Sequence, residues 1–115
     1  MFETINWRMF IDAKSKEKAN KVVKTLTQVI GEIEILSLER YWKDQTKFEL
    51  VCKTKLEVKE SEKAVFNALV IANQIAQEIY VIGPTLYEGN QIEFEGMSSS
   101  PKIVGISWFH FYIEN

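Results

Sequence analysis

The chain has 115 residues, of which 46% are hydrophobic and 26% charged, with a formal net charge of −2, one cysteine and one histidine. These fractions are close to the globular average and predict one compact domain over residues 1–115. A single cysteine excludes an internal disulfide, and Cys52 with His110 supplies too few ligands for a structural zinc site. We therefore expect a fold stabilised by its hydrophobic core, with no cofactor or metal.

The N-terminal part predicts a strand followed by an amphipathic helix. Residues 7–13 alternate between two sides, which is the period of a strand. In residues 19–30, apolar side chains recur every three or four positions, with lysines on the opposite side. Ser15 suits the N-cap of this helix, and Gly31 suits its C-terminal end.

The middle of the chain predicts a hairpin and a second helix. Residues 33–42 and 48–58 both alternate, and the polar residues 43–47 separate them. Two such strands around a short polar turn form an antiparallel hairpin. Ser61 opens a helical pattern with a broad apolar stripe, which indicates deep burial.

The C-terminal part completes a βαββαβ order. Residues 79–82 form an apolar run that we expect Gly83 and Pro84 to end. This order predicts an α+β, ferredoxin-like fold, an antiparallel sheet with two helices on one face. Strands at 91–95 and 103–113, with a loop at 96–102 between them, then extend the sheet by one or two strands or fold over it.

A cytoplasmic protein is expected. The chain starts with neither a basic leader nor an apolar run of the length of a signal peptide. Its apolar stretches are all shorter than the roughly 18 residues of a membrane span. A free cysteine suits a reducing compartment.

Candidates for catalysis are few. No common motif for phosphate, nucleotide or metal binding occurs. Cys52 is either a nucleophile or a buried hydrophobe, and its place among the core-facing residues of its strand favours burial. His110 is either a general base or a ring stacked between aromatics; Glu93 and Glu95 are either an acid–base pair or solvated strand charges. In each case the second interpretation is favoured, so we expect no enzyme.

The charges are unevenly distributed. Residues 1–63 hold thirteen of the 14 lysines and arginines against eleven acids, whereas residues 64–115 hold Lys102 against five acids. An RNA-reading sheet couples exposed aromatics to a basic surface. With a net charge of −2 and two arginines in all, nucleic-acid binding is not expected.

The aromatic content exceeds what a core of this size needs. Seven Phe, four Tyr and three Trp place apolar bulk on both faces of the predicted sheet, and the helices cover one face only. Exposed aromatics among acidic residues are typical of a protein-binding surface. The candidate partner-binding residues are Trp42, Glu88, Glu93, Glu95, Trp108, His110 and Tyr112.

The C-terminal part resembles small immunity-type proteins of bacterial toxin systems. The resemblance rests on a Gly-Pro turn at 79–84, a Phe-Glu-Gly step at 92–96 and a Gly-Ile-x-Trp strand at 103–109. It implies a cytoplasmic bacterial protein without catalysis that binds and blocks a cognate toxin, and it assigns no residue roles. An acidic, aromatic surface would independently suit a basic toxin domain. The alternative hypothesis is a ferredoxin-like homodimer that binds a small apolar ligand between sheet and helices, as a sensor or a small enzyme.

Overall fold

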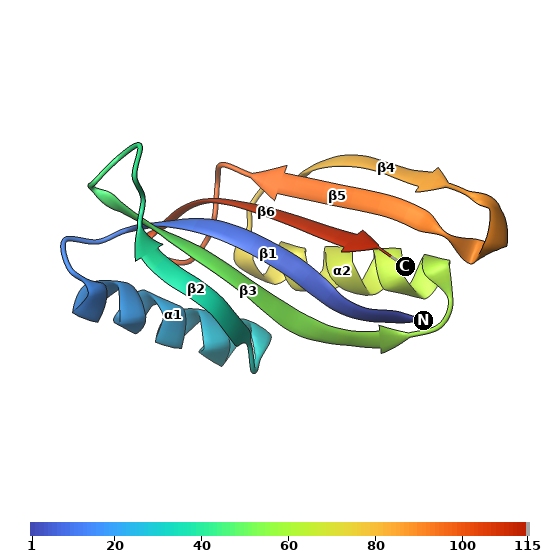
Figure 1. Ribbon diagram of the computed structural model, residues 1–115, viewed down its shortest axis with the longest axis horizontal. Helices are drawn as coiled ribbons and strands as arrows, with labels where there is room; N and C mark the ends of the chain where they lie inside the picture. The colour runs from blue at the N-terminus through green and yellow to red at the C-terminus, as the bar shows by residue number, and fades with distance from the viewer. Residues whose placement is uncertain (115) are drawn as a thin grey trace.

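The computed structural model describes residues 1–114 and shows one six-stranded antiparallel sheet with two helices on the same face (Figure 1). The predicted α+β class is therefore confirmed. In chain order the elements are β1 (Phe2–Asp12), α1 (Lys16–Ile30), β2 (Glu34–Arg40), β3 (Lys47–Val58), α2 (Ser61–Ile75), β4 (Tyr80–Leu86), the 3-10 turn η1 (Glu88–Asn90), β5 (Ile92–Ser98) and β6 (Ile106–Glu114).

Helix α1 begins and ends where its sequence predicts. The Ser15 hydroxyl accepts a hydrogen bond from the backbone N–H of Lys18 at 3.3 Å. Gly31 closes the helix with a φ of +87°, a conformation that a side chain would disfavour. The face formed by Ala19, Val23 and Leu26 is buried against the sheet and α2, as the spacing predicts.

The order of the strands differs from a simple βαββαβ sheet. In a ferredoxin-like order the fourth strand would pair with β1, but the observed order is β2-β3-β1-β6-β5-β4, and β6 takes that place. The physical reason lies in the two strands. Pro84 cannot donate a backbone hydrogen bond, which suits β4 to the edge of the sheet. β6 is apolar almost throughout, and its inward-facing residues Phe109, Phe111 and Ile113 are buried near the centre.

Two predicted strand ends on β2 and β4 are wrong. β2 ends at Arg40, so Trp42 lies in the turn before β3 and not on a strand face. β4 does not stop at Gly83 and Pro84: the pairing with β5 shifts register between Ile82 and Thr85 and then continues to Leu86. An edge strand tolerates this break, since only one of its sides needs partners.

Two further predictions, for β5 and β6, are also corrected. β5 runs on to Ser98 through Gly96, where a loop is predicted, and β6 begins only at Ile106. Gly96 belongs in the strand because the ring of Phe111 occupies the space beside it: a Cβ there would lie 2.6 Å from two ring carbons. Gly96, which the sequence suggests as part of a loop, thus leaves space for the core side chain of Phe111.

The core lies between the sheet and the helices. Trp7 is buried, with its ring centroid 5.3 Å from that of Phe111, and its indole N–H donates to the hydroxyl of Thr54 at 2.9 Å. Cys52 is also buried, as predicted, and desolvation raises the pKa of its thiol to about 12. A thiol in this state is a packing group and not a nucleophile.

Candidate functional site

The face of the sheet opposite the helices is open. The C-terminal segment does not fold over it but supplies β5 and β6 to the sheet itself (Figure 1). Pairing of β1 with β6 places Arg8 beside His110 and Phe10 beside Trp108 on this face. Residues from the first and last strands therefore form one surface.

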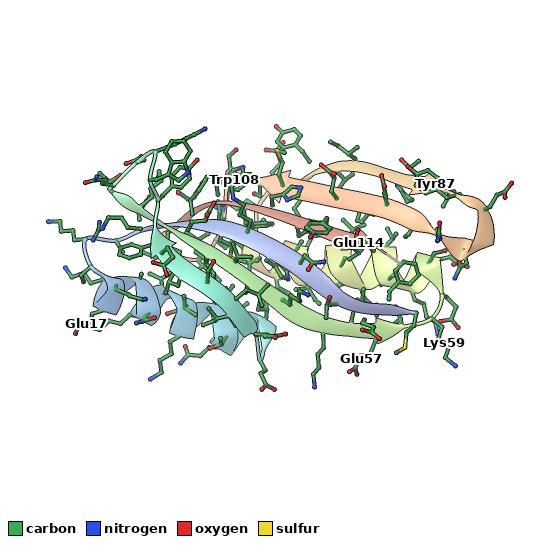
Figure 2. The ribbon with its side chains drawn as sticks, in the orientation of Figure 1. Glu17, Glu57, Lys59, Tyr87, Trp108 and Glu114 are labelled. Atoms are coloured by element: carbon green, nitrogen blue, oxygen red, sulfur yellow. The ribbon has the colours of Figure 1, made fainter. Side chains whose placement is uncertain are left out.

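A row of rings crosses the open face. The centroid of Phe10 lies 4.7 Å from that of Tyr41 and 5.0 Å from that of Trp108. Trp108 is followed along β6 by His110 at 6.3 Å, and His110 by Tyr112 at 6.1 Å. We call these five side chains the aromatic row; Figure 2 labels Trp108 within it. Ring separations of this size are attractive contacts, so the row is a preorganised apolar surface.

Arg8 packs against the aromatic row on the same face of the sheet. Its guanidinium carbon lies 4.9 Å from the ring centroid of Phe10 and 5.6 Å from that of Trp108, and its Nε pairs with Glu49 at 2.5 Å. Cation–π contacts and a carboxylate partner engage this cation within the protein. Arg8 therefore contacts two rings of the row and one carboxylate of the same face, and its side chain stays 42% exposed.

The β5 side of the open face is acidic. Glu93 stands directly opposite Glu114, Glu95 stands opposite Tyr112, and we call the three carboxylates the acidic corner. Glu95 lies 3.5 Å from Nε2 of His110. β4, β5 and β6 contain no lysine or arginine, so no permanent cation on these strands balances the corner.

Glu93 also accepts a hydrogen bond from a tyrosine. The hydroxyl of Tyr87 donates to its carboxylate at 3.2 Å, and this hydrogen bond to a negative charge raises the pKa of Tyr87. Tyr87 and Glu114 are labelled in Figure 2. The hydrogen bond orients one of the carboxylates in the acidic corner, but it does not neutralise it.

We expect Glu93→Gln to stabilise the protein. Like charges directly opposite on neighbouring strands are unfavourable, and the amide keeps an acceptor for Tyr87. The free energy of unfolding in urea should rise by about 0.2–1 kcal/mol at low salt. The gain should shrink in 1 M NaCl, where charges are screened within about 3 Å. A loss of stability at low salt would show that Glu93 and Glu114 do not repel one another.

The structure brings together five of the seven predicted partner-binding residues. Trp108, His110 and Tyr112 lie in the aromatic row, and Glu93 and Glu95 lie in the acidic corner beside it.

The other two lie elsewhere. Trp42 stands in the β2–β3 turn with 78% of its surface exposed, and its ring is 6.2 Å from that of Tyr41 at one end of the row. Glu88 belongs to η1, the turn between β4 and β5, which contributes nothing to the row. Trp42 therefore extends the surface, whereas Glu88 is peripheral to it.

Sequence reasoning missed Phe10, Arg8 and Tyr41 as parts of this surface. The alternation of β1 does place Phe10 and Arg8 on the side away from Trp7. Their position beside Trp108 depends on the pairing of β1 with β6, which no local pattern reports. Glu114 was missed for the same reason, because it becomes notable only opposite Glu93.

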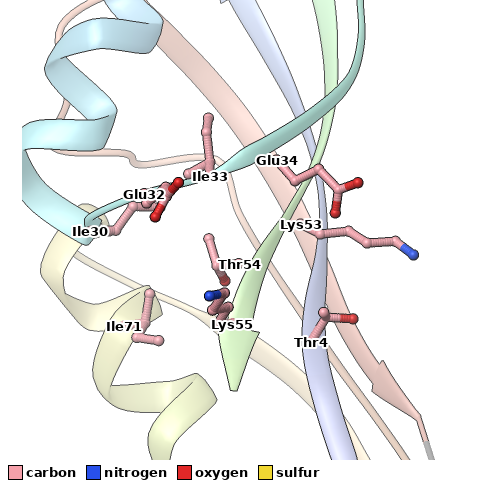
Figure 3. Close-up of a pocket in the computed structure, with 9 residues that line it drawn as sticks. All are labelled: Thr4, Ile30, Glu32, Ile33, Glu34, Lys53, Thr54, Lys55 and Ile71. Atoms are coloured by element: carbon pink, nitrogen blue, oxygen red, sulfur yellow. The ribbon is translucent and has the colours of Figure 1, made fainter. Parts of the chain in front are cut away.

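Cavities occur on the helix side of the sheet. The one in Figure 3 measures about 480 Å³, and Ile30, Ile33 and Ile71 line it where α1, α2 and β3 meet. A wider groove of about 740 Å³ runs between α2 and the end of β4, past Phe66 and Leu86. Both are of a size that small apolar ligands occupy.

Comparisons with protein-family models, with curated proteins and with solved structures find no match to this chain. Within residues 1–114, no three His, Cys, Asp or Glu side chains gather in a way that could hold a metal ion. Neither described helix has the length and apolar character needed to cross a membrane. Any function assigned to the protein therefore rests on the residues of its own surface.

Proposed function

We propose that this protein is a non-catalytic binding module whose open sheet face binds another protein. The observation that carries the proposal is the aromatic row on a sheet face that neither helix covers. Trp, Tyr and Arg dominate the energetics of protein interfaces, and ordered rings lose little conformational entropy on binding. The row supplies Trp108, Tyr41 and Tyr112 in one patch, and Arg8 packs against its rings.

The charges on this face support a basic partner. The acidic corner adjoins the row, and Arg8 is already paired with Glu49. Complementary charge accelerates association and fixes the relative orientation of two proteins. The carboxylates of the acidic corner oppose RNA binding, because an RNA-binding sheet combines stacking rings with a basic surface.

In its most specific form, the proposal is a cytoplasmic bacterial immunity protein that binds and blocks a basic toxin domain. It rests on the resemblance of the C-terminal strands to such proteins and on the acidic, aromatic character of the surface. A gene for a large secreted toxin directly upstream would support this form. The broader proposal, binding of a protein partner, does not depend on it.

A pull-down from the native cell tests the proposal. We expect the wild-type protein to capture a basic partner and the double variant Trp108→Ala, Glu93→Lys to lose it, because the variant removes a ring of the row and reverses a charge of the corner. Glu17→Lys is the matched control, since it makes the same charge change on α1, on the other side of the sheet (Figure 2). Equal capture by wild type and double variant, or no capture by either, would contradict the proposal.

The second candidate function is the binding of a small apolar ligand. The cavity of Figure 3 favours it, because three isoleucines line a space of about 480 Å³ between sheet and helices. Native mass spectrometry of protein purified from its own cell would show a bound small molecule if this function is correct. A ligand-free protein that captures a basic partner would leave the open face as the functional surface.

A further inference from the structure

The two edges of the sheet differ in their charges. β2, at one edge, carries Glu34, Glu39 and Arg40, whereas β4, at the other edge, has no charged residue. Natural proteins protect exposed edges with charges, because an unpaired strand is a template for another strand. β2 is protected by its charges, whereas β4 has only Pro84 and the register shift after Ile82, which leave Tyr80–Ile82 unprotected.

β4 is also apolar and exposed along its whole length. Tyr80 and Ile82 are each 61% exposed, Leu86 is 72% exposed, and Val81 lies between the first two with 47% exposed. Tyr80 and Ile82 stand opposite Met97 and Glu95 and so point to the open face, whereas Val81 stands opposite Gly96 and points to the helix side. A strand added beside β4 would cover apolar side chains on both faces.

From these observations we infer that β4 pairs with β4 of a second copy of this chain, so that two sheets join into one. In a two-fold strand pair, a charge close to the axis faces the same charge of the second copy, and an edge without charges avoids this repulsion. The register shift at Gly83 and Pro84 limits the regular edge to Tyr80–Ile82. All three residues are paired only when the two-fold axis passes beside Val81, so that Val81 of one copy stands opposite Val81 of the other.

This register is self-complementary. Each Tyr80 stands opposite Ile82 of the second copy on the open face, an aromatic–β-branched pair of the kind that stabilises sheets, and the two Val81 side chains meet on the helix side. The paired edge is three residues long in each copy, which is shorter than a standard specific interface requires, so we expect a weak dimer with a Kd in the micromolar range. In the joined sheet of the dimer, both outer edges are β2 strands. Because these edges carry charges, we expect no further copies to add to them.

Sedimentation velocity over a wide concentration range tests the inference. Wild-type protein should pass from monomer to dimer between about 1 and 500 μM, with a Kd in that range. Val81→Lys places two like charges on the axis and should weaken the dimer at least about tenfold. Leu36→Lys is the matched control, an apolar residue of β2 that is 52% exposed, and it should leave the dimer unchanged.

A cross-link provides a second readout that does not depend on affinity. Opposed residues in an antiparallel pair have Cβ atoms about 4.5–5.5 Å apart, near the range that a disulfide spans. Oxidation should therefore join Val81→Cys into a covalent dimer and leave Leu36→Cys monomeric, while Cys52 stays buried in both. A wild-type protein that is monomeric at 500 μM, or a dimer that Leu36→Lys weakens as much as Val81→Lys does, overturns the inference.

Discussion

Replacing Phe111 by alanine is expected to lower the free energy of unfolding by about 3–5 kcal/mol. The ring is fully buried near the centre of the sheet and contacts Trp7 and Phe94, with centroids at 5.3 and 6.1 Å. Removing it deletes apolar contacts and leaves a cavity that the surrounding strands cannot close. Urea denaturation followed by tryptophan fluorescence measures the change. Phe111→Leu, which keeps most of the volume, should cost less than half as much.

Gly96 offers an internal control for this result. In the wild type, Gly96→Ala should destabilise the protein by about 1–3 kcal/mol, because its methyl group would collide with the ring of Phe111. In the Phe111→Ala background the same substitution should be nearly neutral, since the ring is gone. Additive effects of the two substitutions would show that Phe111 does not fill the space beside Gly96.

Trp108→Ala is expected to weaken binding of the protein partner by at least about 30-fold, corresponding to roughly 2 kcal/mol or more. Trp108 stands at the middle of the aromatic row, between Phe10 and His110, where ring contacts hold it in place. A central, ordered tryptophan is the typical hot spot of an interface. Calorimetric titration with the captured partner measures the affinity.

The control for this prediction is Val29→Ala, which truncates an exposed apolar residue of α1 on the other face. It should change the affinity by less than about twofold, because substitutions outside an interface leave binding nearly unchanged. Circular dichroism and urea denaturation should show that both variants are folded. Unchanged affinity in a folded Trp108→Ala protein would exclude the aromatic row as the binding surface.

Local structure could be predicted from the sequence because its causes are local. The caps Ser15 and Gly31 and the period of the residues between them define α1, and alternation defines the β2–β3 hairpin. The order of strands has no local cause. It depends on which strands need burial on the helix side, so the βαββαβ order wrongly predicted that the strand at 79–82 pairs with β1, where β6 lies instead.

The candidate site also has a part that the sequence predicts and a part that depends on strand order. Alternation along β6 places Trp108, His110 and Tyr112 on one face, and this was predictable from the sequence. Phe10 joins them only because β1 and β6 are neighbours, a contact between distant parts of the chain. The surface is thus assembled across strands, and a sequence read one segment at a time recovers only the part that one strand contributes.

The central position of β6 also bears on how the protein folds. Asn6 and Tyr112 face one another in the β1–β6 pair, so the middle of the sheet joins its first and last strands. Pairings between residues so far apart in the chain slow folding, because a large loop must close before the contacts form. Until β6 has paired, one edge of β1 lacks a partner strand. The β4–β5 pair then has no strand pairing with the rest of the sheet. β6 therefore joins the two parts of the sheet, and chains in which it has not yet paired expose open strand edges that favour aggregation.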